Sequence, residues 1–391
     1  MTLRIAITAE PIPSHVSALD YVICPALEQG HRVTLHAPSM FRREARLRGV
    51  GFGRAGAEWT CDPVVQRAAS EVWQRHGNAA FNRYVFGDLW PGQAEAKARD
   101  LLGAWARERP DLVIAECGDL GAQLAARVLG LPLLAADNGL GPVLLDLWDA
   151  HVAPALLPLY KRYELDPPAL PPMLGPAPVH WFYEGREIPP PPSVRAVRRT
   201  LAPFRTALAE GLVPALSLRP SRPLVYVSLG TLTTAMSGLR RVVGDAYREI
   251  MAALRAIDCD AIVSAGDLAG RLPSGSPHLR VVPHAPQPAL LRRADLFVTH
   301  GGRASLLDAV QGATPVLGMG VLGDQPGNTA AFARRGLGRA LDITAGREAI
   351  AGALTDLLDT PRYGAAMGAA GAELAQLPPL DFQEIRGMLG G

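Results

Sequence analysis

Cysteine is scarce in this 391-residue chain, and its sequence has no long apolar run. The four cysteines lie far apart and form no C-x-x-C pair, which argues against both a zinc site and a disulfide framework. The N-terminus has no signal-peptide pattern, and no stretch approaches the roughly 18 uninterrupted apolar residues of a membrane span. We therefore expect a cytoplasmic protein with reduced thiols and no stable membrane insertion.

The net charge is also small, because 39 basic residues nearly balance 37 acidic residues and leave a formal charge of +2. So weak a charge argues against nucleic acid or an anionic membrane as the main partner, and a small or apolar substrate fits better. Lysine occurs only at Lys97 and Lys161, beside 40 glycines and 35 prolines. That composition is typical of a GC-rich bacterial genome.

The first 40 residues alternate between apolar runs and helical periodicity. Leu3–Ala9 is a short apolar run, and Arg32–Ala37 has the pattern of a second strand. Between them, Ser14 is placed to cap a helix whose apolar residues recur at helical spacing as far as Gly30. Such βαβ units build parallel sheets with helices on both faces.

The same alternation returns along the chain and predicts an α/β fold of two Rossmann-like domains that face each other across a cleft. We expect an N-terminal domain over residues 1–200 and a C-terminal domain over 220–375. Prolines crowd the sequence before residue 193, so a linker is expected over 187–223. The tail, residues 376–391, is expected to pack back on the N-terminal domain.

Further elements are predicted from the same patterns. Strands are expected at Asp111–Ala115, Leu131–Ala135, Leu224–Leu229, Asp260–Ala265, Leu279–Pro283, Asp295–His300 and Thr314–Met319, and helices near Asp119–Leu129, Arg241–Ile257 and Arg303–Gln311. Residues 54–109 are expected to be mostly helical. Together with residues 139–180, they are expected to shape a variable site for a small-molecule substrate. Their apolar character suits a flat hydrophobic ligand and equally an ordinary core.

The segment from His284 to Asn328 carries the most informative motif. A strand ends at Thr299, and His300-Gly301-Gly302 turns directly into a helix. Open α/β sheets bind ligands at the carboxyl ends of their strands, and a helix N-terminus presents free N–H groups with about half a positive charge. The segment therefore predicts a diphosphate site in which His300 donates to a phosphate oxygen.

Polar side chains further along the segment suit the rest of a nucleotide sugar. Ser305 offers a hydroxyl in the first turn of the helix, and Asp308 lies about two turns beyond His300, where it can accept from ribose hydroxyls. Asp324 and Gln325 supply a carboxylate and an amide for the hydroxyls of the sugar.

This segment resembles the nucleotide-sugar signature of the inverting GT-B glycosyltransferases of family 1, the UGT and antibiotic type. Their pattern runs W-x-P-Q, then H-x-G-x-x-S/T-x-x-E, then a Gly and a Pro, then D-Q-x-x-N. The matching residues are His284-Ala285-Pro286-Gln287, then His300, Gly302, Ser305 and Asp308, then Gly312 and Pro315, then Asp324, Gln325 and Asn328. Two residues depart from the pattern. His284 replaces the Trp that stacks on the donor base, and Asp308 replaces a longer Glu.

The resemblance also implies roles outside that segment. It implies that His15 is the general base that deprotonates the acceptor, and that Glu116, rather than the later Asp119, orients it. A histidine titrates near neutrality, and a carboxylate on its other nitrogen fixes the tautomer and stabilises the imidazolium. Gly230-Thr231 resembles the turn that lies near the donor phosphates in this family.

The activity that the resemblance implies is inverting transfer of a hexose or deoxysugar from a dTDP- or UDP-sugar to a small hydrophobic natural product. It implies no metal and no further cofactor, because no D-x-D motif lies near the donor segment and a helix N-terminus can replace the metal. Two alternatives stay open, a nucleotide-sugar epimerase of the same layout and a non-catalytic helper of a partner transferase. Homodimer formation also stays open.

Overall fold

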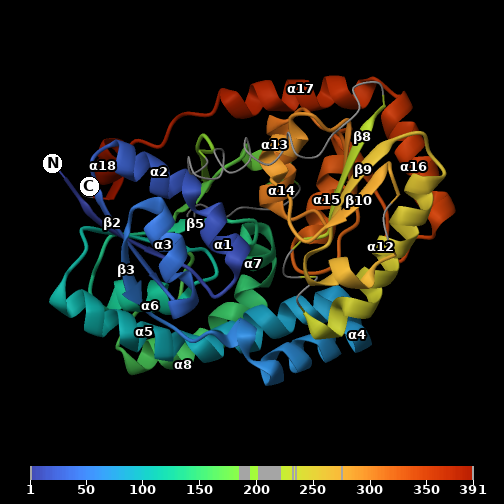
Figure 1. Cartoon of the computed structure of the whole chain (residues 1–391). Coiled ribbons are helices and arrows are strands. Elements are labelled where there is room, and N and C mark those ends of the chain that lie inside the picture. The colour runs from blue at the N-terminus through green and yellow to red at the C-terminus, as the bar shows by residue number, and fades with distance from the viewer. Residues whose placement is uncertain are drawn as a thin grey trace. The chain divides into compact units, whose positions relative to one another are not determined.

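The computed structural model describes residues 2–184, 194–200, 222–230, 233, 236–273 and 276–389. The chain divides into two compact units (Figure 1). The N-terminal unit holds Met1–Ala202 together with Gln376–Gly391, and the C-terminal unit holds Pro203–Ala375. Most of the expected linker lies outside the described residues, and so does Thr231.

The N-terminal unit is built on a parallel sheet whose described strands follow the order β3-β2-β1-β4-β5-β6-β7. These strands are β1 Arg4–Thr8, β2 Arg32–Ala37, β3 Gly51–Arg54, β4 Leu112–Glu116, β5 Leu133–Ala136, β6 Met173–Gly175 and β7 Val194–Ala196. β2 and β4 lie on opposite sides of β1, so the strand order reverses between β1 and β4. Ligands of open α/β sheets bind at the carboxyl ends of strands at such a reversal.

Helices connect these strands. They are α1 Pro13–Ala18, α2 Asp20–Glu28, α3 Arg42–Arg48, α4 Pro63–Arg83, α5 Trp90–Arg107, α6 Leu120–Val128, α7 Gly141–Leu147, α8 Ala153–Arg162, α9 Val179–Tyr183 and, from the tail, α18 Phe382–Leu389. A short π-helical turn at Tyr84–Leu89 joins α4 to α5. Residues 54–109 are therefore mostly helical, as their sequence predicts.

The expected cap at Ser14 is wrong. The helix after β1 begins at Pro13 with Ile12 at its N-cap, so Ser14 lies inside the first turn and its side chain caps nothing. Proline favours the first helical position because its fixed φ suits a helix and its missing N–H is not needed there. The helix also breaks at Leu19, which separates α1 from α2.

The C-terminal unit has a second parallel sheet, in which the described strands follow the order β10-β9-β8-β11-β12-β13. Its strands are β8 Leu224–Ser228, β9 Asp260–Ser264, β10 Leu279–Val282, β11 Leu296–Thr299, β12 Val316–Gly318 and β13 Gly338–Ala340. Its helices are α12 Arg240–Arg255, α13 Gln287–Leu291, α14 Arg303–Gln311, α15 Gln325–Arg334, α16 Arg347–Asp359 and α17 Arg362–Ala375. Here the order reverses between β8 and β11. Within the described residues, no helix is long and apolar enough to cross a membrane.

The C-terminal tail completes the core of the N-terminal unit. Leu380, Phe382 and Ile385 are buried with the apolar residues of β1, β2 and α2. The side-chain amide of Gln29 donates to the carbonyl of Leu380 at 2.6 Å and accepts from the N–H of Phe382 at 3.0 Å. Figure 1 shows α18 beside α2, although they come from opposite ends of the chain.

Truncation of Phe382 is expected to destabilise the N-terminal unit. Its ring is fully buried, so Phe382→Ala leaves a cavity and should lower the free energy of unfolding by about 3–5 kcal/mol. All six tryptophans lie in this unit, so denaturant unfolding followed by tryptophan fluorescence reports on it. The control is Val64→Ala, because Val64 is 72% exposed and its truncation should change the free energy by less than about 0.5 kcal/mol. Equal effects of the two variants would show that the tail does not stabilise the unit.

Candidate active site

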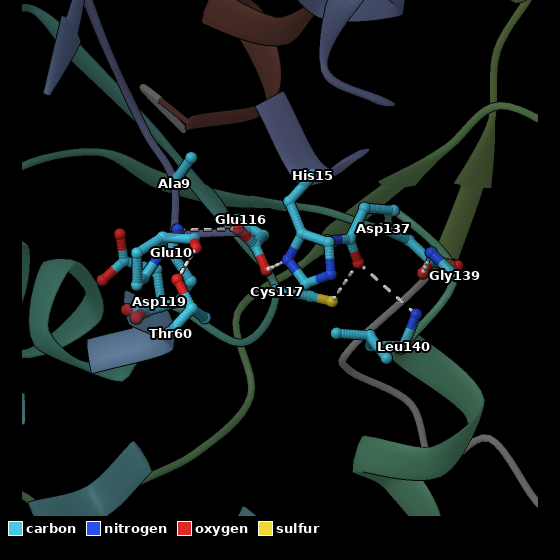
Figure 2. Close-up of polar contacts among 12 residues, drawn as sticks. Ala9, Glu10, His15, Thr60, Glu116, Cys117, Asp119, Asp137, Gly139 and Leu140 are labelled. Atoms are coloured by element: carbon cyan, nitrogen blue, oxygen red, sulfur yellow. Dashed lines mark hydrogen bonds and ion pairs between the residues drawn. The ribbon is translucent and has the colours of Figure 1, made fainter. Parts of the chain in front are cut away.

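Two side chains from adjacent strand ends meet in the N-terminal unit. Glu116 is the last residue of β4, and His15 lies in α1, shortly after β1. Thr8 of β1 pairs with Ala115 of β4, and this register brings the chain that leaves β1 beside Glu116. His15 Nδ1 lies 2.5 Å from Glu116 Oε1 (Figure 2). The Glu116 side chain is fully buried and that of His15 is 12% exposed, so the histidine is the member that solvent reaches.

The surroundings of Glu116 favour its charged form. Burial acts to raise the pKa of this carboxyl, but His15, the N–H of Glu10 and the charge of Lys97 together lower it below its ordinary value. The N–H of Glu10 donates to Glu116 Oε2 at 2.8 Å. When Nδ1 of the neutral ring donates to Glu116, Nε2 is left as the proton acceptor. The pair has the arrangement of a base and its orienting carboxylate.

Asp119, the alternative acidic residue, has other partners. Its Oδ1 accepts from the N–H of Ala122 at 3.0 Å and caps α6. Its Oδ2 lies 2.6 Å from Lys97 Nζ. The structure thus pairs His15 with Glu116 and Asp119 with a lysine.

Sequence reasoning missed Asp137, a buried acidic residue that directly follows β5. Its Oδ1 accepts from the N–H groups of Gly139 and Gly141 at 2.8 and 3.0 Å. Its Oδ2 accepts from the hydroxyl of Tyr183 at 2.6 Å. Cys117 follows the neighbouring strand β4, and its Sγ lies 3.6 Å from Oδ1 of Asn138, the residue after Asp137 (Figure 2). The strand-end rule, applied to β5, would have identified Asp137.

In the C-terminal unit, His300 follows β11 in a turn lined by glycines. Thr299 of β11 pairs with Ser228 of β8, so His300 lies beside the turn at Gly230. A Cβ at Gly230 would lie 2.6 Å from His300 Nε2, and a Cβ at Gly302 would lie 2.7 Å from it. Gly230 also has a φ of +86°, a backbone angle that residues other than glycine rarely adopt. The imidazole therefore fits only because backbone, not side chain, lines this turn.

His300 is neutral at pH 7. Burial lowers its pKa to about 4, although a hydrogen bond with the Ser228 backbone acts in the opposite direction. Gly302 is the N-cap of α14, so the N-cap residue itself has no side chain at the start of that helix. The helix end supplies a positive potential beside this neutral ring, an arrangement that suits an anion.

Three more of the predicted donor residues come together beside α14. Gln287, at the start of α13, donates from its side-chain amide to Asp308 Oδ2 at 2.8 Å and to the Ser305 hydroxyl at 3.2 Å. Asp308 is buried at 2% exposure, whereas Ser305 and Gln287 are half-buried. His284 is exposed after β10, and Ala285 is half-buried beside it.

Asp324 and Gln325 begin α15 and are held close to the His300 turn. The side-chain amide of Asn328 donates to the Gly301 carbonyl at 3.1 Å and to Asp324 Oδ2 at 2.5 Å. Gln325 Oε1 accepts from the N–H groups of Val321 and Leu322 at 3.2 and 3.1 Å. Asn328 thus links the start of α15 to the turn at His300 and Gly301.

The predicted residues therefore form two groups, one on each unit. His15 and Glu116 meet at the strand reversal of the N-terminal unit, and the predicted donor residues gather at strand ends of the C-terminal unit. Across the residues that the structure describes, no cluster of three or more His, Cys, Asp or Glu could hold a metal ion.

Known proteins resemble this chain in sequence and in fold. Residues 219–369 match the family model described as UDP-glucoronosyl and UDP-glucosyl transferase. The chain is 34% identical to the zeaxanthin glucosyltransferase of Pantoea ananas over 118 residues, which are 30% of this chain and 27% of that protein. The first curated relatives are matched over only about a third of their own length or less. The oleandomycin glycosyltransferase of Streptomyces antibioticus is 25% identical over 94% of this chain and 89% of its own.

Solved structures confirm the predicted fold. Spinosyn rhamnosyltransferase SpnG complexed with thymidine diphosphate has a TM-score of 0.74 at 17% identity, with 97% of each chain covered. The same enzyme complexed with spinosyn aglycone has a TM-score of 0.75 at 17% identity, covering 96% of this chain and 97% of that one. The chain therefore has the GT-B fold of two Rossmann-like units. With the family match over residues 219–369, this confirms the resemblance read from the motifs.

A methyl group at Gly302 is expected to displace His300. The Cβ of Gly302→Ala would lie 2.7 Å from Nε2, so the ring must move, at a cost of about 1–3 kcal/mol in the free energy of unfolding. Unfolding followed by circular dichroism measures the loss. Gly352→Ala in α16 is the control, because nothing lies within 4 Å of its Cβ and the change should be neutral or stabilising by about 0.5–1 kcal/mol. A Gly302→Ala protein as stable as the control would contradict the close contact.

Acid is expected to destabilise the C-terminal unit through His300. The pKa of this group is about 4 in the folded chain and 6.5 in the unfolded one, so the unfolded chain binds more protons between these values. Stability should therefore fall as the pH drops from about 6.5 to 4, by about 1–2 kcal/mol after allowance for partial exposure. Unfolding of wild type and His300→Asn by circular dichroism at several pH values measures this difference. His284→Asn, at an exposed histidine, should keep the wild-type pH dependence. The same pH dependence in His300→Asn and wild type would refute the assignment.

Proposed function

We propose that this chain is an inverting glycosyltransferase that moves a sugar from a nucleoside diphosphate to a hydroxyl group of a small hydrophobic acceptor. The observation that carries the proposal is the hydrogen bond between His15 Nδ1 and Glu116 Oε1. It leaves Nε2 of a partly exposed histidine as a proton acceptor, which a transferase to hydroxyl groups requires. The family match of residues 219–369 and the names of the relatives support the reaction class.

On the acceptor side, His15 acts as general base. Nε2 takes the proton of the acceptor hydroxyl as its oxygen attacks the anomeric carbon from the face opposite the nucleotide. The bond from that carbon to the diphosphate oxygen breaks in the same step, which inverts the configuration. Glu116 stabilises the imidazolium that forms, because it is charged and already hydrogen-bonded to Nδ1.

On the donor side, the turn at His300 and the start of α14 hold the diphosphate. The leaving diphosphate gains charge as its bond to the sugar breaks, so donors fixed in advance stabilise the transition state more than the ground state. One such donor is worth roughly 3–4 kcal/mol in other enzymes. We propose that Gly301 and Gly302, with Gly230 beside them, let the phosphates approach the backbone, and that Thr231, which lies outside the described residues, belongs to the same donor site. In this proposal the helix end takes the place of a metal ion.

The remaining donor residues are assigned by their neighbours. Gln287 and Asp308 form the ribose subsite, with Ser305 between them and the phosphates. Asp324 and Gln325 face the sugar hydroxyls from the start of α15. His284 and Ala285 lie beside the base. Thymidine diphosphate in SpnG and the UDP-sugar family description support dTDP or UDP as the nucleotide.

Loss of the base is expected to lower the rate of transfer without weakening donor binding. His15→Ala should lower the transfer rate by about 10²- to 10⁴-fold and leave the affinity for dTDP or UDP nearly unchanged. His300→Ala should instead weaken nucleotide binding. Product formation from dTDP-glucose and UDP-glucose with a panel of polyphenol and macrolide acceptors measures transfer, and calorimetry measures binding. His76→Ala is the matched control, because His76 is an exposed histidine of α4 in the same unit.

Each alternative has its own outcome in this experiment. Transfer that persists in His15→Ala would refute the base assignment. Conversion of the donor sugar without any acceptor would indicate an epimerase. A wild-type chain that binds neither nucleotide would indicate a helper protein, and transfer abolished by a chelator would refute the metal-free proposal.

A further inference from the structure

Lys97, one of two lysines in the chain, is buried in the N-terminal unit with a full set of partners. It lies on α5, and its side chain is 4% exposed. Nζ donates to the carbonyl of Ala9 at 2.8 Å and lies 3.0 Å from Glu10 Oε1 and 2.6 Å from Asp119 Oδ2. A buried ammonium group is tolerated only when it is paired and hydrogen-bonded in this way.

The packing around Lys97 leaves room for this one side chain. A Cβ at Gly121 would lie 2.8 Å from the Lys97 Cβ, so glycine there lets α5 approach α6. A Cβ at Gly56 would lie 3.0 Å from the Lys97 Cδ. The other oxygen of Glu10, Oε2, accepts from Trp59 Nε1 at 2.9 Å. The residues around Lys97 therefore accommodate its side chain specifically.

The partners of Lys97 lead directly to the proposed base. Glu10 carries both the carboxylate that Lys97 contacts and the backbone N–H that donates to Glu116 Oε2. Glu116 Oε1 in turn accepts from His15 (Figure 2). The contacts thus run without a gap from Asp119 through Lys97, Glu10 and Glu116 to His15.

We propose that Glu10, Lys97 and Asp119 form a charge triad that positions Glu116 and sets the pH dependence of the His15–Glu116 pair. The inference rests on the proposed function only for the role of His15 as base. None of the three touches a substrate in this proposal. They act through the loop after β1 and through the charge around Glu116.

The electrostatics of the cluster support this role. Burial acts to lower the pKa of Lys97, but Asp119 and Glu10 together raise it, so the ammonium stays charged. Burial raises the pKa of Glu10 to about 7, and Lys97 opposes that rise. The charge of Lys97 also acts on His36 of β2, and burial first and this charge second lower the pKa of His36 to about 4. The lysine is therefore the permanent cation of the cluster, set against Glu10, Asp119 and Glu116.

Substitutions of opposite charge test the triad. Lys97→Met keeps the length of the side chain but removes a positive charge, which favours the imidazolium form of His15. The titration midpoint of His15 should move to higher pH by about half a unit to one unit, limited by protonation of Glu10. Asp119→Asn keeps an oxygen to cap α6 but removes a negative charge, so it should move the midpoint to lower pH. The double variant restores the balance and should titrate near wild type.

Two readouts follow the midpoint in the full-length chain. The first is the NMR signal of histidine labelled with ¹³C at Cε1, assigned by its loss in His15→Asn, which needs no substrate. The second is the acid limb of the pH–rate profile for sugar transfer, which should move in the same direction in each variant. KM for the donor should stay unchanged, because the donor residues lie on the other unit. Lys161→Met is the matched control, since Lys161 is the exposed lysine of the same unit.

The outcomes distinguish failure of the triad proposal from failure of the proposed function. Midpoints that stay at the wild-type value in both single variants, or that move in the same direction, overturn the triad. If Lys97→Met does not fold, as judged by circular dichroism, Asp119→Asn decides alone. If the NMR midpoints move in opposite directions and no variant or wild type transfers sugar, the triad stands and the proposed function fails.

Discussion

The hydrogen bond between His15 and Glu116 joins residues 101 positions apart and depends on the order of the strands. It forms because β4 returns to pair with β1 on the side that β2 leaves open. The reversal leaves the carboxyl ends of both strands free of a crossing connection, so the chain that leaves β1 can reach the end of β4. A sheet in plain sequential order would separate the two side chains.

The C-terminal unit uses the same geometry for another purpose. Its strand order reverses between β8 and β11, and the turns after these strands bring Gly230 and His300 into contact. Here close approach of backbone takes the place of a pair of side chains. Glycine at 230 and 302 is needed because the imidazole occupies the space in which a Cβ would lie.

Local sequence patterns predicted much of this arrangement. The motif from His284 to Asn328 identified α14 and the turn before it, because both depend on residues that are close in sequence. The short strands β3, β6, β7 and β13 were missed, since three or four residues that include glycine or lack alternation give no strand signal. The partners of Lys97 could not be read either. Glu10 and Ala9 lie 87 and 88 residues before it, and Asp119 lies after β4 at the start of α6. Only the folded sheet brings them together.

The two units handle buried charge in opposite ways, and the chemistry explains the difference. In the proposed reaction the base carries a positive charge for part of the time, so His15 needs a carboxylate that is already ionised when the proton arrives. Burial alone would protonate Glu116, and the cations and N–H groups around it prevent this. The proposed phosphate site differs, because burial keeps His300 neutral near pH 7 and the positive potential comes from the start of α14.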